Sequence, residues 1–197
     1  MKEKTKPESR SATTTPPAVK IAIIATYAGL CVGAGYMLAL IPNVEIFTML
    51  VFLGGLLFGK AIGSLVGFIA SILYFIFNLY GASPIPLLVV QLVAYTVLGF
   101  AGGFFNDSSL RKNITRKSQV VLGIIGASFA FGYTIIADLI FSYIMGINFW
   151  AWVAQGSIFT GILVVCNAIT FSSLLPLILV PLDKHMVAIF SSAVNLK

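Results

Sequence analysis

Long apolar runs separated by four polar interruptions organise this sequence. Residues 42–45 end the first run, residues 78–86 end another, and residues 106–119 form a polar and basic stretch. The fourth interruption, residues 146–155, contains two tryptophans. The runs are continuous and lack the alternation of polar and apolar residues found in barrel strands. They therefore predict helices that span a membrane.

The apolar stretch 46–77 is ambiguous, because it holds a single charge, Lys60. As one helix it would be about 48 Å long, well beyond a hydrocarbon core of about 30 Å. It would also place Lys60 near the middle of the membrane, at a cost of about 2.5–3.5 kcal/mol. A break at Phe58-Gly59-Lys60 instead produces two short spans joined by a tight turn.

The distribution of positive charge decides between five and six spans. With six spans, all 12 Lys and Arg residues fall on one side of the membrane. With five spans, the basic residues of the 106–119 loop would face the side opposite to the N-terminal segment. Because basic residues concentrate on the cytoplasmic side, we predict six spans with both termini in the cytoplasm. The predicted spans are 20–41, 44–59, 61–80, 85–105, 119–147 and 155–182.

The predicted organisation is an all-α, six-helix bundle over residues 19–183, in a multi-pass protein of the plasma membrane. Residues 1–18 are rich in Lys, Ser, Thr and Pro and are expected to form a disordered cytoplasmic tail. Residues 184–197 are expected to form a short cytoplasmic or interfacial tail.

Composition supports a membrane protein and excludes several other classes. The chain is 59% hydrophobic and only 9% charged, whereas soluble domains carry about a quarter charged residues. The net charge of +6 does not indicate nucleic-acid binding, because the basic residues are scattered over short segments without a basic face. Cys31 and Cys166 lie within apolar runs and are expected to be packing residues rather than a disulfide.

Polar residues recur at helical spacing in the last four predicted spans. These polar faces should turn towards one another, since a polar group facing lipid is costly. In the predicted topology they lie in the outer half of the membrane, which favours a pocket open to the outside over a channel. The candidate ligand-binding residues are Asn43, Glu45, Asn78, Gln91, Tyr95, Thr134, Asp138, Ser142, Trp150 and Asn167.

Several of these residues have alternative roles. Asp138, a carboxylate within a span, is a candidate for binding a ligand or cation, for pairing with Tyr or Asn in the bundle, or for relaying protons. Gln91 and Asn167 are alternatively interhelical hydrogen-bonding residues. Glu45 is alternatively a cap of the second helix. Trp150, like Trp152, is alternatively an anchor in the outer interface.

Small residues also recur at helical spacing in the first span, at Ala22, Ala25, Gly29 and Gly33. Such a stripe marks a place where another helix approaches closely, either within the bundle or from a partner.

Chemistry for catalysis or nucleotide use is missing from the sequence. It contains no Gly-x-x-x-x-Gly-Lys-Ser/Thr loop, so the chain is not expected to use ATP by that route. The single histidine, His185, lies beyond the last span, on the side of the membrane opposite to Asp138. We therefore expect neither an enzyme nor a bound cofactor or metal.

One family shares several of these features. The block Ile41-Pro-Asn-Val-Glu45, the glycines from Gly54 to Gly67, Gln91 and the Gly99-Phe-Ala-Gly-Gly103 turn resemble the substrate-binding subunits (S components) of energy-coupling factor vitamin transporters. The pair Asp138 and Asn167 is similar to the same group. The resemblance covers roughly residues 20–182.

The resemblance implies a six-helix protein that captures a vitamin or related micronutrient on the outer side of the membrane. It also implies docking, through small residues of the first helix, onto a transmembrane coupling protein driven by two cytoplasmic ATPases. The docking motif of the family is Ala-x-x-x-Ala, and the nearest match here is Ala25-x-x-x-Gly29, continued by Gly33.

The predicted outer side constrains the cargo. It contains no Lys or Arg for bidentate capture of a phosphate or carboxylate. Its carboxylates, amides and aromatic rings suit a neutral or cationic molecule that contains a ring. Among the cargoes of the family, a cobalamin-type corrinoid resembles the pattern most closely, thiamine-related compounds and queuosine precursors stay open, and folate is disfavoured. The alternatives are a stand-alone ion- or proton-coupled carrier and a non-transporting membrane scaffold.

Overall fold

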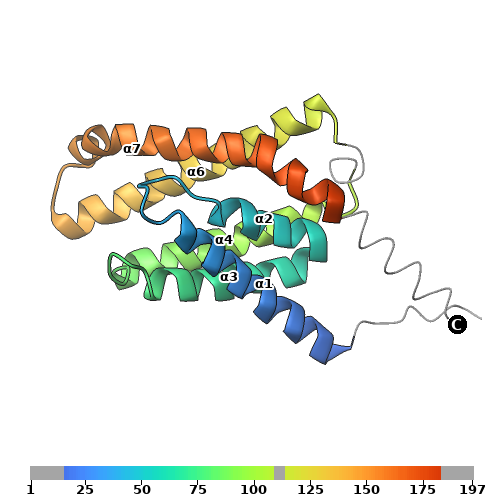
Figure 1. The fold of residues 1–197 in the computed structure, drawn as a ribbon. Helices are drawn as coiled ribbons and strands as arrows, with labels where there is room; N and C mark the ends of the chain where they lie inside the picture. The colour runs from blue at the N-terminus through green and yellow to red at the C-terminus, as the bar shows by residue number, and fades with distance from the viewer. Residues whose placement is uncertain (1–15, 109–113, 183–197) are drawn as a thin grey trace, which may run out of the picture.

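The described residues form helices only. The computed structural model describes residues 16–108 and 114–182, and Figure 1 shows their arrangement. The helices are α1 (Pro17–Met37), α2 (Phe47–Phe58), α3 (Lys60–Ile76), α4 (Ile85–Phe104), α6 (Arg116–Met145), α7 (Phe149–Ile169) and the π-helical turn η1 (Thr170–Leu174). The all-helical prediction is confirmed. Helices α1, α4, α6 and α7, the last continuing to Leu182, are long and apolar enough to cross a membrane, as is typical of a membrane protein.

The predicted break in the stretch 46–77 is confirmed. Helix α2 ends at Phe58, and α3 begins at Lys60. Gly59 between them has a φ of 85°, a left-handed conformation that glycine adopts without steric penalty. The chain therefore reverses within a single residue.

Helix α2 is the central element of the bundle. Every residue from Phe47 to Leu57 is buried, so this helix is enclosed by the others. Its 12 residues reach only about 18 Å, against a hydrocarbon core of about 30 Å. The connection 38–46 precedes this helix and lines the cavities described below. The short length of α2 is what leaves room for a site.

Helices α2, α3 and α4 approach one another closely through glycines. A Cβ on Gly99 of α4 would lie 2.1 Å from the carbonyl oxygen of Gly63 on α3, and a Cβ on Gly55 of α2 would lie 2.0 Å from the carbonyl oxygen of Gly99. Only glycine allows backbones to meet at these distances. Helices α6 and α7 pack mainly against each other, with η1 also against α6.

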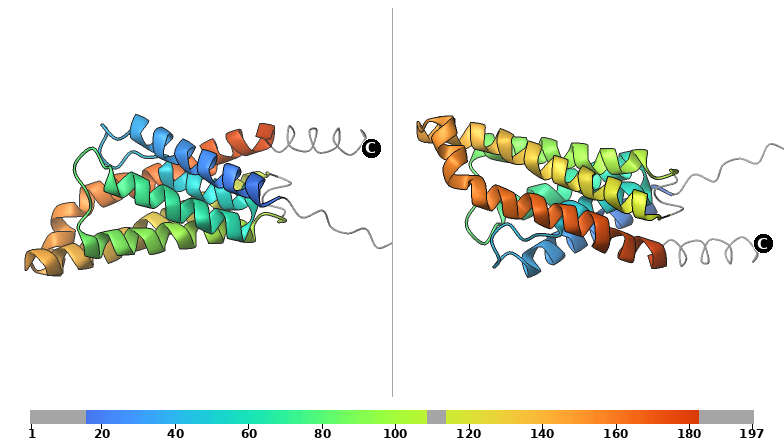
Figure 2. Two further views of the ribbon diagram at one scale, coloured as in Figure 1. Left: turned by 90° about the horizontal axis from the view of Figure 1, so that it is seen from below. Right: turned by 90° about the horizontal axis from the view of Figure 1, so that it is seen from above.

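The hairpin formed by α6 and α7 extends beyond the other four helices, as Figures 1 and 2 show. Its turn is shorter than predicted: the 146–155 interruption is wrong beyond residue 148, because α7 begins at Phe149. Gly146 ends α6 in the left-handed conformation (φ 64°), and the side chain of Asn148 accepts hydrogen bonds from the N–H groups of Trp150 and Ala151. These two caps allow a tight turn.

Other predicted boundaries differ from the structure by up to four residues. Helix α1 ends at Met37 rather than 41, α2 begins at Phe47 rather than 44, and α3 ends at Ile76 rather than 80. Helix α6 begins at Arg116 rather than 119, because the Thr115 hydroxyl accepts a hydrogen bond from the N–H of Ser118. Helix α1 begins at Pro17, two residues inside the predicted tail, since proline suits the first turn of a helix. The remainder of both predicted tails, residues 1–15 and 183–197, lies outside the described residues.

The two ends of the bundle differ in charge. Figure 1 places the start of α1, the α2–α3 turn, the start of α6 and the end of the last helix at one end. These segments carry the four Lys and Arg residues of the described part of the chain: Lys20, Lys60, Arg116 and Lys117. The α1–α2 connection, the α3–α4 connection and the α6–α7 turn lie at the other end. We call these the basic end and the non-basic end.

Candidate functional site

Glu45 is the centre of a hydrogen-bond network near the non-basic end. It lies just before α2, and its carboxylate accepts hydrogen bonds from the N–H of Thr48 (3.2 Å), the hydroxyl of Thr48 and the amide of Asn167 on α7 (3.2 Å). The bond to the Thr48 N–H is a helix cap, so the capping role is present. The bond to Asn167 joins the α1–α2 connection to the opposite helix pair.

The network continues to Tyr95 on α4. The hydroxyl oxygens of Thr48 and Tyr95 lie 3.2 Å apart. Because the Thr48 hydroxyl gives its proton to Glu45, Tyr95 must be the donor to Thr48. Glu45 is thus surrounded by groups that donate to it directly or in relay, and Thr48, Tyr95 and Asn167 are all buried.

Aromatic rings form the walls around this network. The ring of Tyr74 lies between those of Tyr36 and Phe47, with centroid distances of 5.1 and 4.3 Å and near-parallel planes. Tyr95 meets Phe47 and Tyr133 edge to face. Stacked and edge-to-face arrangements are the favoured geometries of aromatic pairs, so these contacts stabilise the walls.

Two buried amides lie behind the walls with an oxygen that has no hydrogen-bond partner among the described residues. Gln91 donates to the Tyr133 hydroxyl (3.2 Å), but its Oε1 is unpaired, and so is Oδ1 of Asn167. Both side chains are less than a twentieth exposed. Buried polar atoms without partners are uncommon in folded proteins, and each asks for an explanation.

A cavity of about 270 Å³ opens beside Glu45, and we call it the tyrosine cavity. Its polar lining comes from Asn43, Glu45, Thr48 and Asn78. Its aromatic lining comes from five tyrosines and two phenylalanines: Tyr36, Tyr74, Tyr80, Tyr95, Tyr133, Phe75 and Phe129. Hydroxyl, amide and carboxylate groups on a largely aromatic surface are typical of a small-molecule site.

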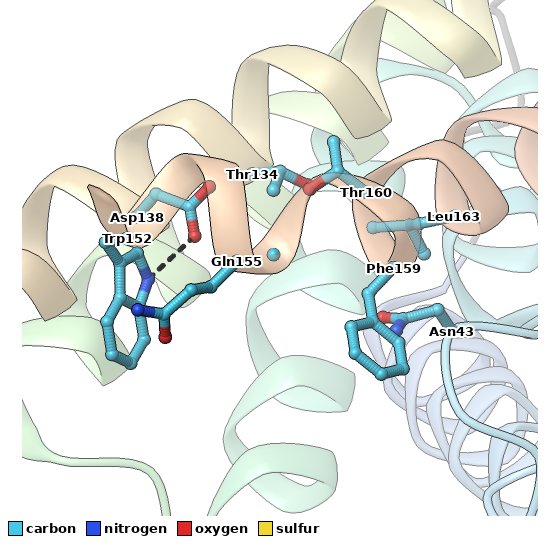
Figure 3. Close-up of a pocket in the computed structure, with 9 residues that line it drawn as sticks. Asn43, Thr134, Asp138, Trp152, Gln155, Phe159, Thr160 and Leu163 are labelled. Atoms are coloured by element: carbon cyan, nitrogen blue, oxygen red, sulfur yellow. Dashed lines mark hydrogen bonds between the residues drawn. The ribbon is translucent and has the colours of Figure 1, made fainter. Parts of the chain in front are cut away.

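A second cavity of about 330 Å³ lies between α6 and α7, and we call it the aspartate cavity. Figure 3 shows Asp138 near one end of it, where the Trp152 indole donates to Oδ1 of the carboxylate at 3.1 Å. Asn43 lies near the other end, close to Phe159. Asn43 and Leu163 line both cavities, so the two are adjacent.

The structure brings together eight of the ten candidate ligand-binding residues. Asn43, Glu45, Asn78 and Tyr95 line the tyrosine cavity, and Asn43, Thr134 and Asp138 line the aspartate cavity. Gln91 and Asn167 do not line the tyrosine cavity but donate hydrogen bonds to two residues that do, Tyr133 and Glu45. Neither cavity includes Ser142, which donates to the backbone of its own helix, or Trp150, which is 74% exposed.

Sequence reasoning did not select Tyr133 or Thr48 as site residues, and it favoured a membrane anchor over a ligand-stacking residue for Trp152. Tyr133 precedes Thr134, so the two side chains leave the helix in directions about 100° apart and do not fall in one stripe. Thr48 follows Glu45 by three residues, the spacing of a helix cap, and this was a usable signal.

The small-residue stripe of α1 lies on the outside of the bundle. Ala22, Ala25, Gly29 and Gly33 are all exposed, and no atom lies within 4 Å of a Cβ placed on either glycine. Packing within the bundle therefore does not explain these four residues. In contrast, Gly55, Gly63 and Gly99 are in contact with neighbouring backbones. Both cysteines are free, as expected.

Comparisons with protein-family models, with curated proteins and with solved structures find no match for this chain.

Proposed function

We propose that this protein is the substrate-capture membrane subunit of a micronutrient importer, similar to the S components of energy-coupling factor transporters. Its cargo is a small molecule with a planar ring, neutral or cationic, which binds in the tyrosine cavity. The observation that carries this proposal is the position and lining of that cavity. It lies towards the non-basic end, and stacked aromatic rings surround the hydrogen-bonded carboxylate of Glu45.

The proposed topology has six membrane crossings, with α2 and α3 as the two short ones. The basic end then faces the cytoplasm, in agreement with the preference of Lys and Arg for that side. The cavities face the outside. Towards the basic end the backbones of α2, α3 and α4 meet at glycines, so these three helices are closely packed there, which supports capture rather than conduction.

The volume of the tyrosine cavity favours a small cargo. At about 270 Å³ it lies at the lower limit for small-molecule sites, which range from about 300 to 1,000 Å³. A thiamine-sized or nucleobase-sized ring system is compatible with this space. A cobalamin-type corrinoid is far larger and would have to bind across the mouth of the cavity with most of its surface outside.

The exposed stripe Ala22, Ala25, Gly29 and Gly33 is the proposed docking surface for a transmembrane coupling protein. Small residues let a second helix approach the backbone of α1 closely. The energy for transport would come from cytoplasmic ATPases attached to that coupling protein.

Binding of candidate cargoes to the purified protein tests the proposal. We expect thiamine or a 7-deazaguanine precursor of queuosine to bind, and Glu45→Gln to weaken binding at least about 10-fold, as expected for loss of a charged hydrogen-bond acceptor. Asp107→Asn is the matched control, since Asp107 is an exposed carboxylate at the basic end. Its affinity should equal that of the wild type.

Two outcomes contradict the proposal. One is the absence of binding by any tested micronutrient, cobalamin included. The other is uptake by proteoliposomes that contain this chain alone under an ion or proton gradient, which would favour the stand-alone carrier with Asp138 as its coupling group.

A further inference from the structure

Asp138 lacks a counter-ion supplied by the described part of the chain. It lies 22 residues after Arg116 in the same helix, which is about 33 Å along the axis. Lys20, Lys60 and Lys117 also belong to the basic end. The polar group that contacts the carboxylate is the neutral indole of Trp152. A carboxylate in a membrane protein without a cationic partner is costly, and such residues usually mark a site for a cation or ligand.

The surroundings of Asp138 are arranged around the carboxylate. The Trp152 ring is held by Phe141, with the centroids 5.8 Å apart and the planes only 13° from parallel. This stack directs the indole N–H at one carboxylate oxygen and leaves the other for a ligand. Thr160 and Gln155 add polar groups to the same cavity wall. A carboxylate beside an indole is suited to an organic ammonium or a similar cationic nitrogen.

The boundary between the two cavities is held by the Glu45 network. Asn43 lies two residues before Glu45 and has a φ of 60°, a conformation that few non-glycine residues adopt. The backbone carbonyl of Leu163 accepts a hydrogen bond from the Asn167 amide, which also donates to Glu45. The residues at the boundary therefore lie beside the Glu45 network, Asn43 through the chain and Leu163 through Asn167.

We infer that one ligand extends from the tyrosine cavity into the aspartate cavity, with its ring between the tyrosines and a cationic nitrogen attached to that ring directed towards Asp138. This inference rests on the proposed function and narrows the cargo from neutral or cationic to cationic. Each cavity alone is near the lower limit for a small-molecule site, whereas the two together are well within the range. Asp138 then determines specificity for charge, and the tyrosine walls determine specificity for the ring.

Two probes that share a ring and differ in charge test the inference. The first is 7-aminomethyl-7-deazaguanine, which carries an ammonium group, and the second is 7-cyano-7-deazaguanine, which is neutral. Thiamine and its neutral oxidation product thiochrome form a second pair. We expect the wild type to bind the ammonium probe about 10- to 100-fold more tightly than its neutral partner, the range for a charge-assisted hydrogen bond. Thiamine, whose thiazolium nitrogen has no N–H to donate, should also bind more tightly than thiochrome, through charge attraction and cation–π contact alone.

Asp138→Asn is the informative variant, because an asparagine oxygen still accepts the hydrogen bond from Trp152. We expect it to weaken binding of the cationic probe by the same 10- to 100-fold factor and to change binding of the neutral probe by less than about 2-fold. Asp107→Asn should leave both affinities unchanged. A purely structural role of Asp138 would instead weaken both probes equally.

Each result of this experiment is decisive. If the wild type binds the two members of a pair with equal affinity, the inference is overturned. The inference is also overturned if cobalamin binds and none of the four probes does. Equal weakening of both members by Asp138→Asn also overturns it, and in each of these cases the proposed function stands. Failure of all four probes and of cobalamin to bind overturns the proposed function itself.

Discussion

A methyl group added at Gly99 should disrupt one of the closest backbone contacts in the bundle. A Cβ at this position would lie 2.1 Å from the carbonyl oxygen and 2.7 Å from the carbonyl carbon of Gly63. Ordinary contact begins at about 3.4 Å, so α3 and α4 must separate by roughly 1.3 Å, because both clashing atoms belong to the backbone. No side-chain rotation can relieve this overlap.

The magnitude follows from two opposing effects. Overpacking a well-packed interior costs about 1–3 kcal/mol, and a backbone clash belongs at the upper end of that range. Replacing glycine by alanine inside a helix returns about 1 kcal/mol. The net expected loss for Gly99→Ala is about 2 kcal/mol, which lowers the melting temperature by about 4–8 °C in a chain of this length.

Thermal unfolding of the purified protein in detergent, followed by intrinsic fluorescence, measures this effect. Gly29→Ala is the matched control, because it makes the same change in an exposed helix position with no atom within 4 Å. It should melt at or slightly above the wild-type temperature. If Gly99→Ala and Gly29→Ala melt within a degree of each other, the close approach of α3 and α4 is wrong.

Substitutions at three other positions separate stability, binding and docking. Gln91→Leu removes a buried amide whose Oε1 is unpaired, so the melting temperature measured by thermal unfolding should stay equal or rise. The affinity for the cargo, measured by titration, should fall. Asn43→Ala should lower stability by about 1 kcal/mol and Asn43→Gly should not, because φ is 60°; denaturant unfolding compares them. Gly33→Leu should leave folding and cargo binding intact but prevent co-purification of a coupling protein, and retained co-purification would exclude α1 as the docking surface.

The sequence alone was sufficient for the helical class and for most helix positions. Continuous apolar runs in a chain with 9% charged residues predict membrane-spanning helices, because helices satisfy their own backbone hydrogen bonds. Barrel strands would alternate polar and apolar residues instead. Charge placement was sufficient to break the stretch 46–77 at Gly59, since a single helix would have buried Lys60 in lipid. Composition and charge act locally along the chain, so both signals are present in the residues themselves.

Helix ends were predicted less well where side-chain caps decide them. The α6–α7 turn ends at Asn148, whose side chain accepts hydrogen bonds from the N–H groups of Trp150 and Ala151 in the first turn of α7. In the sequence, the tryptophans that follow resemble an interruption of the apolar run. A cap depends on one or two hydrogen bonds, and hydropathy does not record these.

Only the tertiary structure decided which polar residues line a cavity and which do not. Periodicity places Asp138 and Ser142 in one stripe of α6, but only Asp138 lines one of the two cavities, whereas Ser142 is buried and bonds to the backbone of its own helix. The tertiary structure also places the indole of Trp152 against Asp138 and leaves Trp150 exposed. Spacing determines which residues share a face of one helix, whereas the rotation of each helix and its neighbours depend on packing between elements far apart in the chain.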